Sequence, residues 1–287
     1  MQGSSMGDIA TRVLGSTLVS SLASRTFTGT RVLAYHDVPS AEQFESNLRT
    51  VLRWCHPVSQ GALCRRSHLA SERNNRVLVT FDDGHASVVE NALPVLLRLG
   101  VPAVMFVSPG IASGDQVFWW DAAHCAESSG VRERLAPHLD SERSLVGALK
   151  HVRDSDRRTI VERAMDEVGP DVPRHAATPE QLRTWLDAGM TLGNHTWDHP
   201  CLDQCSEAEQ RHQLQAAHAW LDEFVGAPPT LFAYPNGDWT IETETLLVEL
   251  GYDAAFLFDH RVDRSTHPLR HSRLRIDASA TTAVSYT

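Results

Sequence analysis

Residues 76–84 read RVLVTFDDG, an apolar run that ends in two adjacent carboxylates and a glycine. The β-branched and aromatic side chains predict a buried strand over Arg76–Phe81. Asp82 and Asp83 then stand at the end of that strand, where an unpaired buried charge is strongly unfavourable. A bound cation resolves this conflict, because it takes one carboxylate as a ligand and leaves the other ionised as a base.

A second polar motif lies far downstream, where residues 193–200 read GNHTWDHP and offer two imidazoles four residues apart. One aspartate with two histidines is typical of catalytic metal sites, which keep a further position for water. Pro200 biases His199 away from helical backbone angles, so we expect an irregular turn or loop rather than a helix. Asp83, His195 and His199 together indicate a metal-dependent hydrolase.

Length and charge narrow the class of protein. A chain of 287 residues suits one large α/β domain or two small ones and can bury a substantial core. The chain has 26 basic and 36 acidic residues, a formal net charge of −10, and its basic residues are scattered. Nucleic-acid binding rests on clustered Lys and Arg, so nucleic acid is not an expected partner.

Cysteine usage favours a reduced compartment, because five cysteines form no dense disulfide framework. Cys201 and Cys205 follow the histidine pair closely, which leaves open a Cys/His zinc site. Ordinary buried or partly buried thiols are the simpler interpretation, since structural zinc sites usually show tighter paired spacings.

Residues 1–30 are expected to be an N-terminal extension, which could be helical, before a catalytic domain over residues 31–287. Residues 9–23 are mildly apolar but interrupted by Arg12, Gly15 and several Ser and Thr, which fits neither a signal peptide nor a membrane span. They could form a short amphipathic helix that docks on the domain, stay disordered, or make weak contact with a membrane surface. A cytoplasmic protein is the default expectation.

Strand-like runs alternate with helical patterns along most of the chain, which favours a mostly parallel sheet with helices outside it. The polar residues His36, Asp82, Asp83, His195 and Asn236 each follow such a run closely. Active sites of parallel barrels gather at the carboxyl ends of the strands, so one shared site is expected. The predicted strands cover residues 31–35, 77–81, 101–107, 230–234, 254–258 and 274–276, and the predicted helices include 44–54, 91–99, 206–225 and 242–250.

Residues 121–168 are charged, apolar at helical intervals and poor in strand signals. Two or three helices are expected there, as an insertion over one rim of the domain that extends to about residue 187. Thr178 with Gln181, and Ser206 with Glu209, have the spacing of helix capping boxes. The insertion is expected to shape the substrate cleft.

Three motifs in order resemble the polysaccharide deacetylase family, the NodB-homology domain of carbohydrate esterase family four. They are TFDDG at 80–84, HTWDH at 195–199 and FAYPNG at 232–237, and the similarity extends over about residues 31–276. Softer matches occur at 118–121, 193–196 and 199–202. The resemblance implies an α/β fold, a distorted (β/α)7 barrel with a helical insertion.

The resemblance also implies roles for individual residues. Asp83, His195 and His199 would be the ligands of a divalent metal, most commonly Zn²⁺, with Co²⁺, Ni²⁺ or Fe²⁺ as alternatives. Asp82 would be the general base for the attacking water. Such a metal lowers the pKa of water toward neutrality and polarises the acetyl carbonyl, and a nearby cation keeps Asp82 ionised.

The general acid departs from the commonest family pattern, which places a histidine in a Leu-x-His motif near the C-terminus. A permuted branch that includes biofilm poly-N-acetylglucosamine deacetylases has it as a Tyr-His pair on the first strand. Tyr35-His36 matches that arrangement, so His36 is predicted to protonate the departing amine. The alternative is that His36 only orients a neighbour. Asp37 could set its charge, and His85 is a conceivable but not favoured fourth ligand.

The third motif lacks the arginine that orients the base in many members, because Ala233 occupies its position. Arg273 and Arg275 are the candidate replacements, and the pattern favours Arg275; surface arginines are the alternative. The backbone N–H of Asn236 could still stabilise a tetrahedral oxyanion, since this needs only the main chain. Three aromatic residues near the strand ends could stack on a sugar, with core packing as the alternative for at least one: Trp119, Trp120 and Tyr234.

The leading hypothesis is an N-deacetylase that acts on an N-acetylated amino sugar in a glycoside, a sugar-bearing metabolite or an oligo- or polysaccharide. The apparent lack of an export signal favours an intracellular glycoside, metabolite or lipid-linked intermediate over a cell-wall polymer. An amidase of the same fold acting on a non-sugar C–N bond remains open. A catalytically silent glycan-binding domain is disfavoured, because such a domain has no physical need for both carboxylates.

Overall fold

The computed structural model describes residues 30–61, 75–114, 116–169, 172–261 and 267–276. Residues 1–29 of the expected N-terminal extension, on which the predictions of an amphipathic helix and of membrane contact fall, lie outside this range, as does Cys64. Among the described residues, no helix has both the length and the apolar character needed to cross a bilayer.

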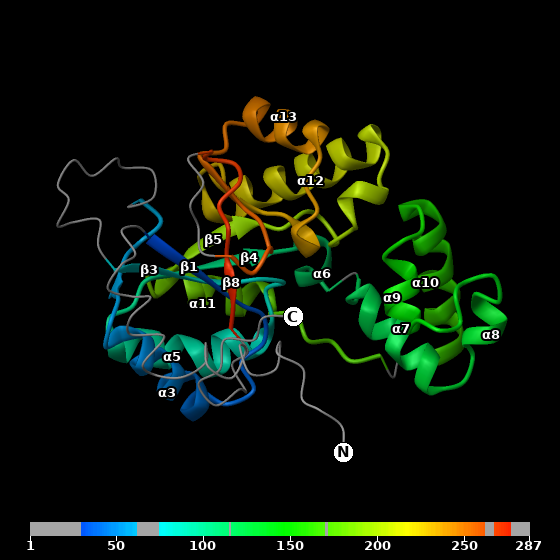
Figure 1. Ribbon diagram of the computed structural model, residues 1–287, viewed down its shortest axis with the longest axis horizontal. Helices are drawn as coiled ribbons and strands as arrows, with labels where there is room; N and C mark the ends of the chain where they lie inside the picture. The colour runs from blue at the N-terminus through cyan, green and yellow to red at the C-terminus, as the bar shows by residue number, and fades with distance from the viewer. Residues whose placement is uncertain (1–29, 62–74, 115, 170–171, 262–266, 277–287) are drawn as a thin grey trace, which may run out of the picture.

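The described residues form an eight-stranded sheet in which all paired strands run parallel. Its order is β7-β6-β5-β4-β3-β1-β8, with β2 paired to β3 off this path, and Figure 1 shows the strands at the centre of the molecule. The strands are β1 Thr30–Tyr35, β2 His56–Pro57, β3 Arg76–Phe81, β4 Ala103–Val107, β5 Thr191–Asn194, β6 Leu231–Ala233, β7 Ala254–Phe256 and β8 Leu274–Arg275.

The sheet curls, and the C-terminal segment spans its two edges. His271 exchanges backbone hydrogen bonds with β7, donating to Ala255 and accepting from Leu257. A few residues later, Leu274 of β8 pairs with Leu33 of β1. The segment 271–275 therefore runs from one edge strand to the far side of the sheet. This curled parallel sheet confirms the expected α/β barrel-like fold.

Alternating side chains of the strands fill two layers, as the period of a strand requires. Val32, Leu78 and Val104 point into an inner cluster with Phe106 and Phe256. The intervening residues pack outward against helices. α3 Ala41–Leu52, α5 Leu93–Leu99 and α11 Pro179–Asp187 lie on one side, whereas α12 Glu207–Val225 and α13 Ile241–Glu249 lie on the other, as Figure 1 shows.

Short helical turns sit at several junctions between the main elements. A π-helical turn, η2 Val88–Ala92, precedes α5, and α6 Pro109–Ala112 follows β4. Two 3₁₀ turns are present: η4 Leu202–Gln204 follows the loop 195–200, here called the histidine loop, and η5 Pro235–Gly237 follows β6. Both predicted capping boxes are present, at Thr178 before α11 and at Ser206 before α12.

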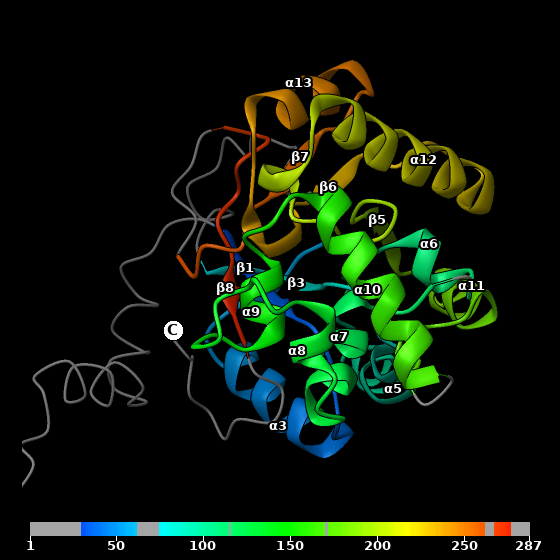
Figure 2. The same cartoon turned by 90° about the vertical axis from the view of Figure 1, so that its right-hand side faces the viewer.

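The insertion forms a separate helical unit, which lies to the right of the sheet in Figure 1 and in front of it in Figure 2. It has its own apolar core, which includes Trp119, Leu135, Leu149 and Ile160. Its helices are α7 Trp119–Ser128, α8 Arg132–Leu135, α9 Leu145–Leu149 and α10 Asp154–Val168. We refer to residues 119–168 as the helical unit.

The end of the insertion differs from the expected boundary near residue 187. Leu182 and Trp185 of α11 are fully buried in the main core, beside strand residues such as Phe81. α11 is therefore one of the helices that cover the sheet. Helical periodicity alone could not separate it from the insertion, because both stretches are helical and the described residues between them form no strand.

Candidate active site

The carboxyl ends of the strands open into one cleft of about 740 Å³. Because β1, β3, β5 and β6 are parallel members of one sheet, their following residues meet at the same edge. The helical unit forms the facing wall. The lining residues are His36, Asp37, Asp82, Asp83, His85, Phe118, Trp119, Trp120, Asp121, His124, Val146, Lys150, His175, His195, His199, Asn236, Phe258, His260 and Arg275.

Asp83, His195 and His199 converge at the base of this cleft. Asp83 Oδ1 lies 3.4 Å from His195 Nε2 and 3.3 Å from His199 Nε2. One ligand atom from each of the three residues can be chosen so that all lie within 4.8 Å of one another. Two donors that hold one zinc ion at about 2.1 Å in tetrahedral geometry are about 3.4 Å apart, so the two Asp83 distances fit a shared ion.

The hydrogen bonds of these residues suit metal binding as well. His195 Nδ1 lies 2.8 Å from the carbonyl oxygen of Ala233, which requires the proton on Nδ1 and leaves the Nε2 lone pair free. Burial lowers the pKa of His199 to about 3, so its imidazole is neutral near pH 7. Buried Asp83 Oδ1 has no hydrogen-bond partner among the described residues. A cation here would satisfy Asp83 Oδ1 and accept the Nε2 lone pairs of the two histidines.

The backbone at the candidate ligands adopts uncommon angles. Asp83 and His199 have φ values of 68° and 58°, and Thr196 has 67°. Non-glycine residues in this left-handed region cost of order 1–3 kcal/mol each and cluster at functional sites. Residues 195–200 form loop and bend rather than helix, which confirms the expectation from Pro200. The side chain of Asn194 stabilises the turn by accepting from the Thr196 N–H at 2.7 Å.

Asp82 is held by Arg273 in a two-pronged ion pair. Arg273 Nη1 and Nη2 lie 2.6 and 2.7 Å from the two carboxylate oxygens, and both side chains are almost completely buried. The arginine also donates from Nε to the carbonyl oxygen of Leu257 and from Nη1 to Thr80 Oγ1. Burial is the largest influence on Asp82 and raises its pKa, but the charge and hydrogen bonds of Arg273, together with nearby His195 and His36, outweigh burial and keep the pKa below its usual value.

This pair corrects the preference for Arg275 as the arginine that orients the base. Arg275 is exposed at the cleft wall, with its guanidinium 5.9 Å from the Phe258 ring, and no ion pair with Asp82 is present. The sequence named both arginines but favoured the wrong one, because the choice depends on how residues 271–275 cross the sheet.

His36 lies at the cleft wall directly after β1, with its ring 4.9 Å from that of Phe258 in an edge-on contact. It is near enough to both carboxylates for its charge to lower their pKa values. Asp37 also lines the cleft. The structure thus brings His36, Asp82 and the three candidate ligands to one site.

Asn236 follows β6 in the left-handed conformation, with φ of 55°, and lines the cleft. Its side-chain amide lies 3.5 Å from Cys201 Sγ. Among the described residues, no acceptor is recorded for its backbone N–H. The arrangement is compatible with the predicted use of this N–H toward a substrate oxygen.

The aromatic residues separate into different roles. Trp120 is half-buried, stacks on Phe118 at 4.6 Å and meets the His199 ring edge-on at 4.7 Å, so it offers a surface beside the ligands. Trp119 touches the cleft but is only 4% exposed, and its indole N–H donates to the His199 carbonyl oxygen at 3.0 Å. Its main role is support of the histidine loop.

Tyr234 does not contact the cleft, which corrects its prediction as a substrate residue. Its side chain is fully buried in the core between the sheet and α13, and its hydroxyl donates to the Leu269 carbonyl oxygen at 3.0 Å. A strand-end position predicts proximity to the site but not the face to which the side chain points.

Several cleft residues were not singled out by the sequence. His124 and Lys150 come from the helical unit, and Phe258 and His260 come from the segment after β7. No motif marks them, since only tertiary packing brings them to the cleft. They support the expectation that the insertion shapes the cleft.

Other metal-binding alternatives receive no support from the described residues. The single candidate group found there excludes Cys201, Cys205 and His85. The ring of His85 instead stacks on that of His175 at 5.1 Å. Burial raises the pKa of the Cys201 thiol to about 11, as expected for an inert buried cysteine.

Comparison with known proteins agrees with this geometry. The sequence model of the family described as "Polysaccharide deacetylase" matches residues 70–255, which include Asp82, Asp83, His195, His199 and Asn236. The chain belongs to the polysaccharide deacetylase family. His36 and Arg273 lie outside the matched segment, so their placement rests on the structure alone.

A curated family relative is the putative polysaccharide deacetylase YxkH of Bacillus subtilis, 19% identical over 233 residues. The match covers 77% of this chain but 61% of that protein, so the chain spans less than two thirds of the relative's length.

Two solved structures share the fold of this chain. Streptococcus pyogenes deacetylase PplD, in complex with acetate, has a TM-score of 0.60 at 16% identity, covering 90% of this chain and 98% of that one. IcaB from Ammonifex degensii has a TM-score of 0.60 at 23% identity, covering 87% and 92%.

Proposed function

We propose that this polysaccharide deacetylase family member removes N-acetyl groups from an N-acetylated amino sugar with the help of a bound divalent metal. The observation that carries the proposal is the convergence of Asp83, His195 and His199 beside an arginine-held Asp82. A binding domain without catalysis would not need a second ionised carboxylate next to the ligand set.

Zinc is the proposed metal, because two neutral imidazole nitrogens and one carboxylate are donors that it binds readily. Co²⁺, Ni²⁺ and Fe²⁺ accept similar donors and remain alternatives. A cation at this site would lower the pKa of water and polarise the acetyl carbonyl. The remaining steps belong to side chains of the chain itself.

In the proposed reaction, a water oxygen attacks the acetyl carbonyl carbon and gives its proton to the Asp82 carboxylate. The Asn236 N–H donates a hydrogen bond to the carbonyl oxygen as negative charge develops there. The C–N bond then breaks, and protonated His36 donates a proton to the departing nitrogen. The products are acetate and the free amino sugar, and Arg273 keeps the Asp82 carboxylate oriented throughout.

A sugar substrate is supported by the aromatic surface beside the candidate ligands. Trp120, stacked on Phe118, offers a flat face at the position where a pyranose ring could pack. Because sugar rings present axial C–H groups as well as hydroxyls, such a face suits them better than it suits a charged peptide.

The proposal is tested by measuring acetate release from a panel of acetylated substrates with added Zn²⁺ or a chelator. The panel includes chitooligosaccharides, poly-β-1,6-N-acetylglucosamine, peptidoglycan fragments, N-acetylglucosamine conjugates and simple N-acetylated amines. Release from a sugar, lost with the chelator and restored by metal, is expected. Release only from non-sugar amides would replace the sugar assignment with an amidase, and unchanged release in the chelator would contradict metal dependence.

The role of His36 predicts a substrate-dependent defect in the His36→Gln variant. Amide hydrolysis should slow by roughly 10²-fold or more, because an amine leaves poorly without a proton. Hydrolysis of p-nitrophenyl acetate should change only a few-fold, because nitrophenolate leaves without protonation. Steady-state rates on both substrates provide the measurement, and an equal loss on both would remove His36 from the acid role.

A further inference from the structure

The helical unit contacts the histidine loop at two points that are adjacent in sequence. Arg158 of α10 forms a two-pronged ion pair with Asp198, at 2.6 and 2.8 Å. Trp119 of α7 donates its indole N–H to the carbonyl oxygen of His199 at 3.0 Å. The helical unit therefore contacts both the candidate ligand His199 and the residue directly before it, Asp198.

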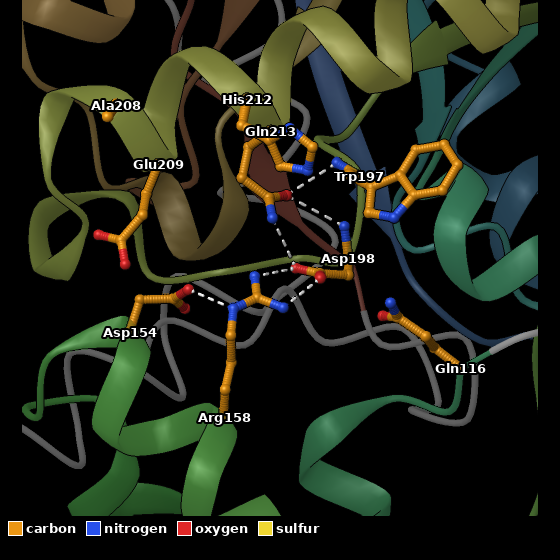
Figure 3. Close-up of a pocket in the computed structure, with 9 residues that line it drawn as sticks. All are labelled: Gln116, Asp154, Arg158, Trp197, Asp198, Ala208, Glu209, His212 and Gln213. Carbon is orange, nitrogen blue, oxygen red and sulfur yellow. Dashed lines mark hydrogen bonds and ion pairs between the residues drawn. The ribbon is translucent and has the colours of Figure 1, made fainter. Parts of the chain in front are cut away.

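These two contacts are joined inside the helical unit by buried charged groups. Asp154 pairs with Arg157 and accepts from Arg158 Nε at 2.6 Å, as Figure 3 shows for Arg158. The Arg157 guanidinium lies 5.0 Å from the centre of the Trp119 ring. Asp154 and Arg157 are both at most 3% exposed. These contacts link Asp198 to His199 through a continuous series of side chains in the helical unit: Arg158, Asp154, Arg157 and Trp119.

Helix α12, which covers the sheet, contacts the same loop from the opposite side. Gln213 of α12 accepts from the backbone N–H groups of Trp197 and Asp198, at 3.0 and 3.1 Å, and donates to Asp198 Oδ1 at 3.0 Å. Figure 3 shows the Asp198 carboxylate between Gln213 and Arg158. The carboxylate is thereby fixed by one group from the barrel helices and one from the insertion.

The loop needs such restraint because His199 holds a left-handed backbone conformation, with φ of 58°. A non-glycine residue in this region relaxes unless its surroundings hold it there. His199 Nε2 lies 3.3 Å from Asp83 Oδ1, and movement of the His199 backbone would increase this distance.

We propose that the helical unit positions His199 for metal binding through the Arg158–Asp198 ion pair and the Trp119–His199 hydrogen bond. Arg158 is then a positioning residue that acts on the metal through the loop. The metal affinity of the site depends on helices outside the barrel. The inference rests on the metal site of the proposed function and adds this dependence to it.

The test uses the full chain and the Arg158→Met variant, which keeps much of the side-chain volume but loses the ion pair. Loss of a group that orients a metal ligand typically weakens metal affinity by about 10–100-fold, and we expect the Zn²⁺ dissociation constant from chelator competition to rise by that factor. The matched control is Arg134→Met, which removes an exposed arginine of the same unit paired with Glu167 at 2.9 Å. Its dissociation constant should stay within about twofold.

Hydrogen exchange in the metal-free protein gives a readout that does not depend on activity or metal. The amides of Trp197 and Asp198 should exchange faster than in the wild type in Arg158→Met, and at the wild-type rate in Arg134→Met. Wild-type protein that binds no Zn²⁺ would overturn the proposed metal site. If the wild-type protein binds Zn²⁺ and the Arg158→Met variant has the same affinity and the same exchange rates, only the positioning role is overturned.

Discussion

Asp82→Asn is expected to lower deacetylation by roughly 10²–10⁴-fold, the range that a general base contributes. Asparagine keeps the shape of the side chain and can still accept a hydrogen bond from Arg273, but it cannot take a proton from water. Asp82 is not part of the candidate ligand group. The variant should therefore retain its metal, and the measurement is kcat beside metal content.

A loss of metal in Asp82→Asn would show that the two carboxylates share the ligand role. A rate within about tenfold of wild type would remove Asp82 from the base role. Ester hydrolysis should fall together with amide hydrolysis in this variant, because both reactions need activated water. This behaviour separates Asp82 from His36, whose loss should spare the activated ester.

Arg273→Leu is expected to destabilise the fold by about 3–5 kcal/mol, the usual cost of removing one partner from a buried ion pair. Both side chains of the pair are at most 3% exposed, so water can replace little of what the guanidinium provides. The main opposition to burial would then be lost, and the pKa of Asp82 should rise. The free energy of unfolding, from urea denaturation, provides the measurement.

Arg275→Leu is the matched control, because Arg275 lies two residues away but is exposed and makes no ion pair with Asp82. Its stability should change by no more than about 0.5 kcal/mol. Removal of the uncompensated charge in the double variant Arg273→Leu/Asp82→Asn should recover part of the loss. Equal effects of the two arginine substitutions would show that Arg273 is not a specific partner of Asp82.

Local patterns predicted the elements of the fold well. The apolar run before Asp82 forms β3, and the Thr178 and Ser206 boxes begin α11 and α12. Such signals act over a few residues, so one sequence is enough to find them. The candidate ligands were also predictable, because their residue types and spacing have few other uses.

Long-range geometry could not be predicted in the same way. Arg273 and Arg275 have the same residue type and the same parity along the chain, yet one is buried against Asp82 and the other faces the cleft. Tyr234 lies at a strand end but points into the core. The support of His199 by Trp119 joins residues 80 positions apart. Each depends on packing between distant segments.

The central claim is that Asp83, His195 and His199 bind one metal ion. Its most direct test is the metal content per chain, by elemental analysis after dialysis, of wild-type, Asp82→Asn and His195→Ala proteins. We expect about one equivalent of Zn²⁺ or a related divalent ion in the first two and almost none in His195→Ala. Full occupancy in a folded His195→Ala protein would contradict the claim.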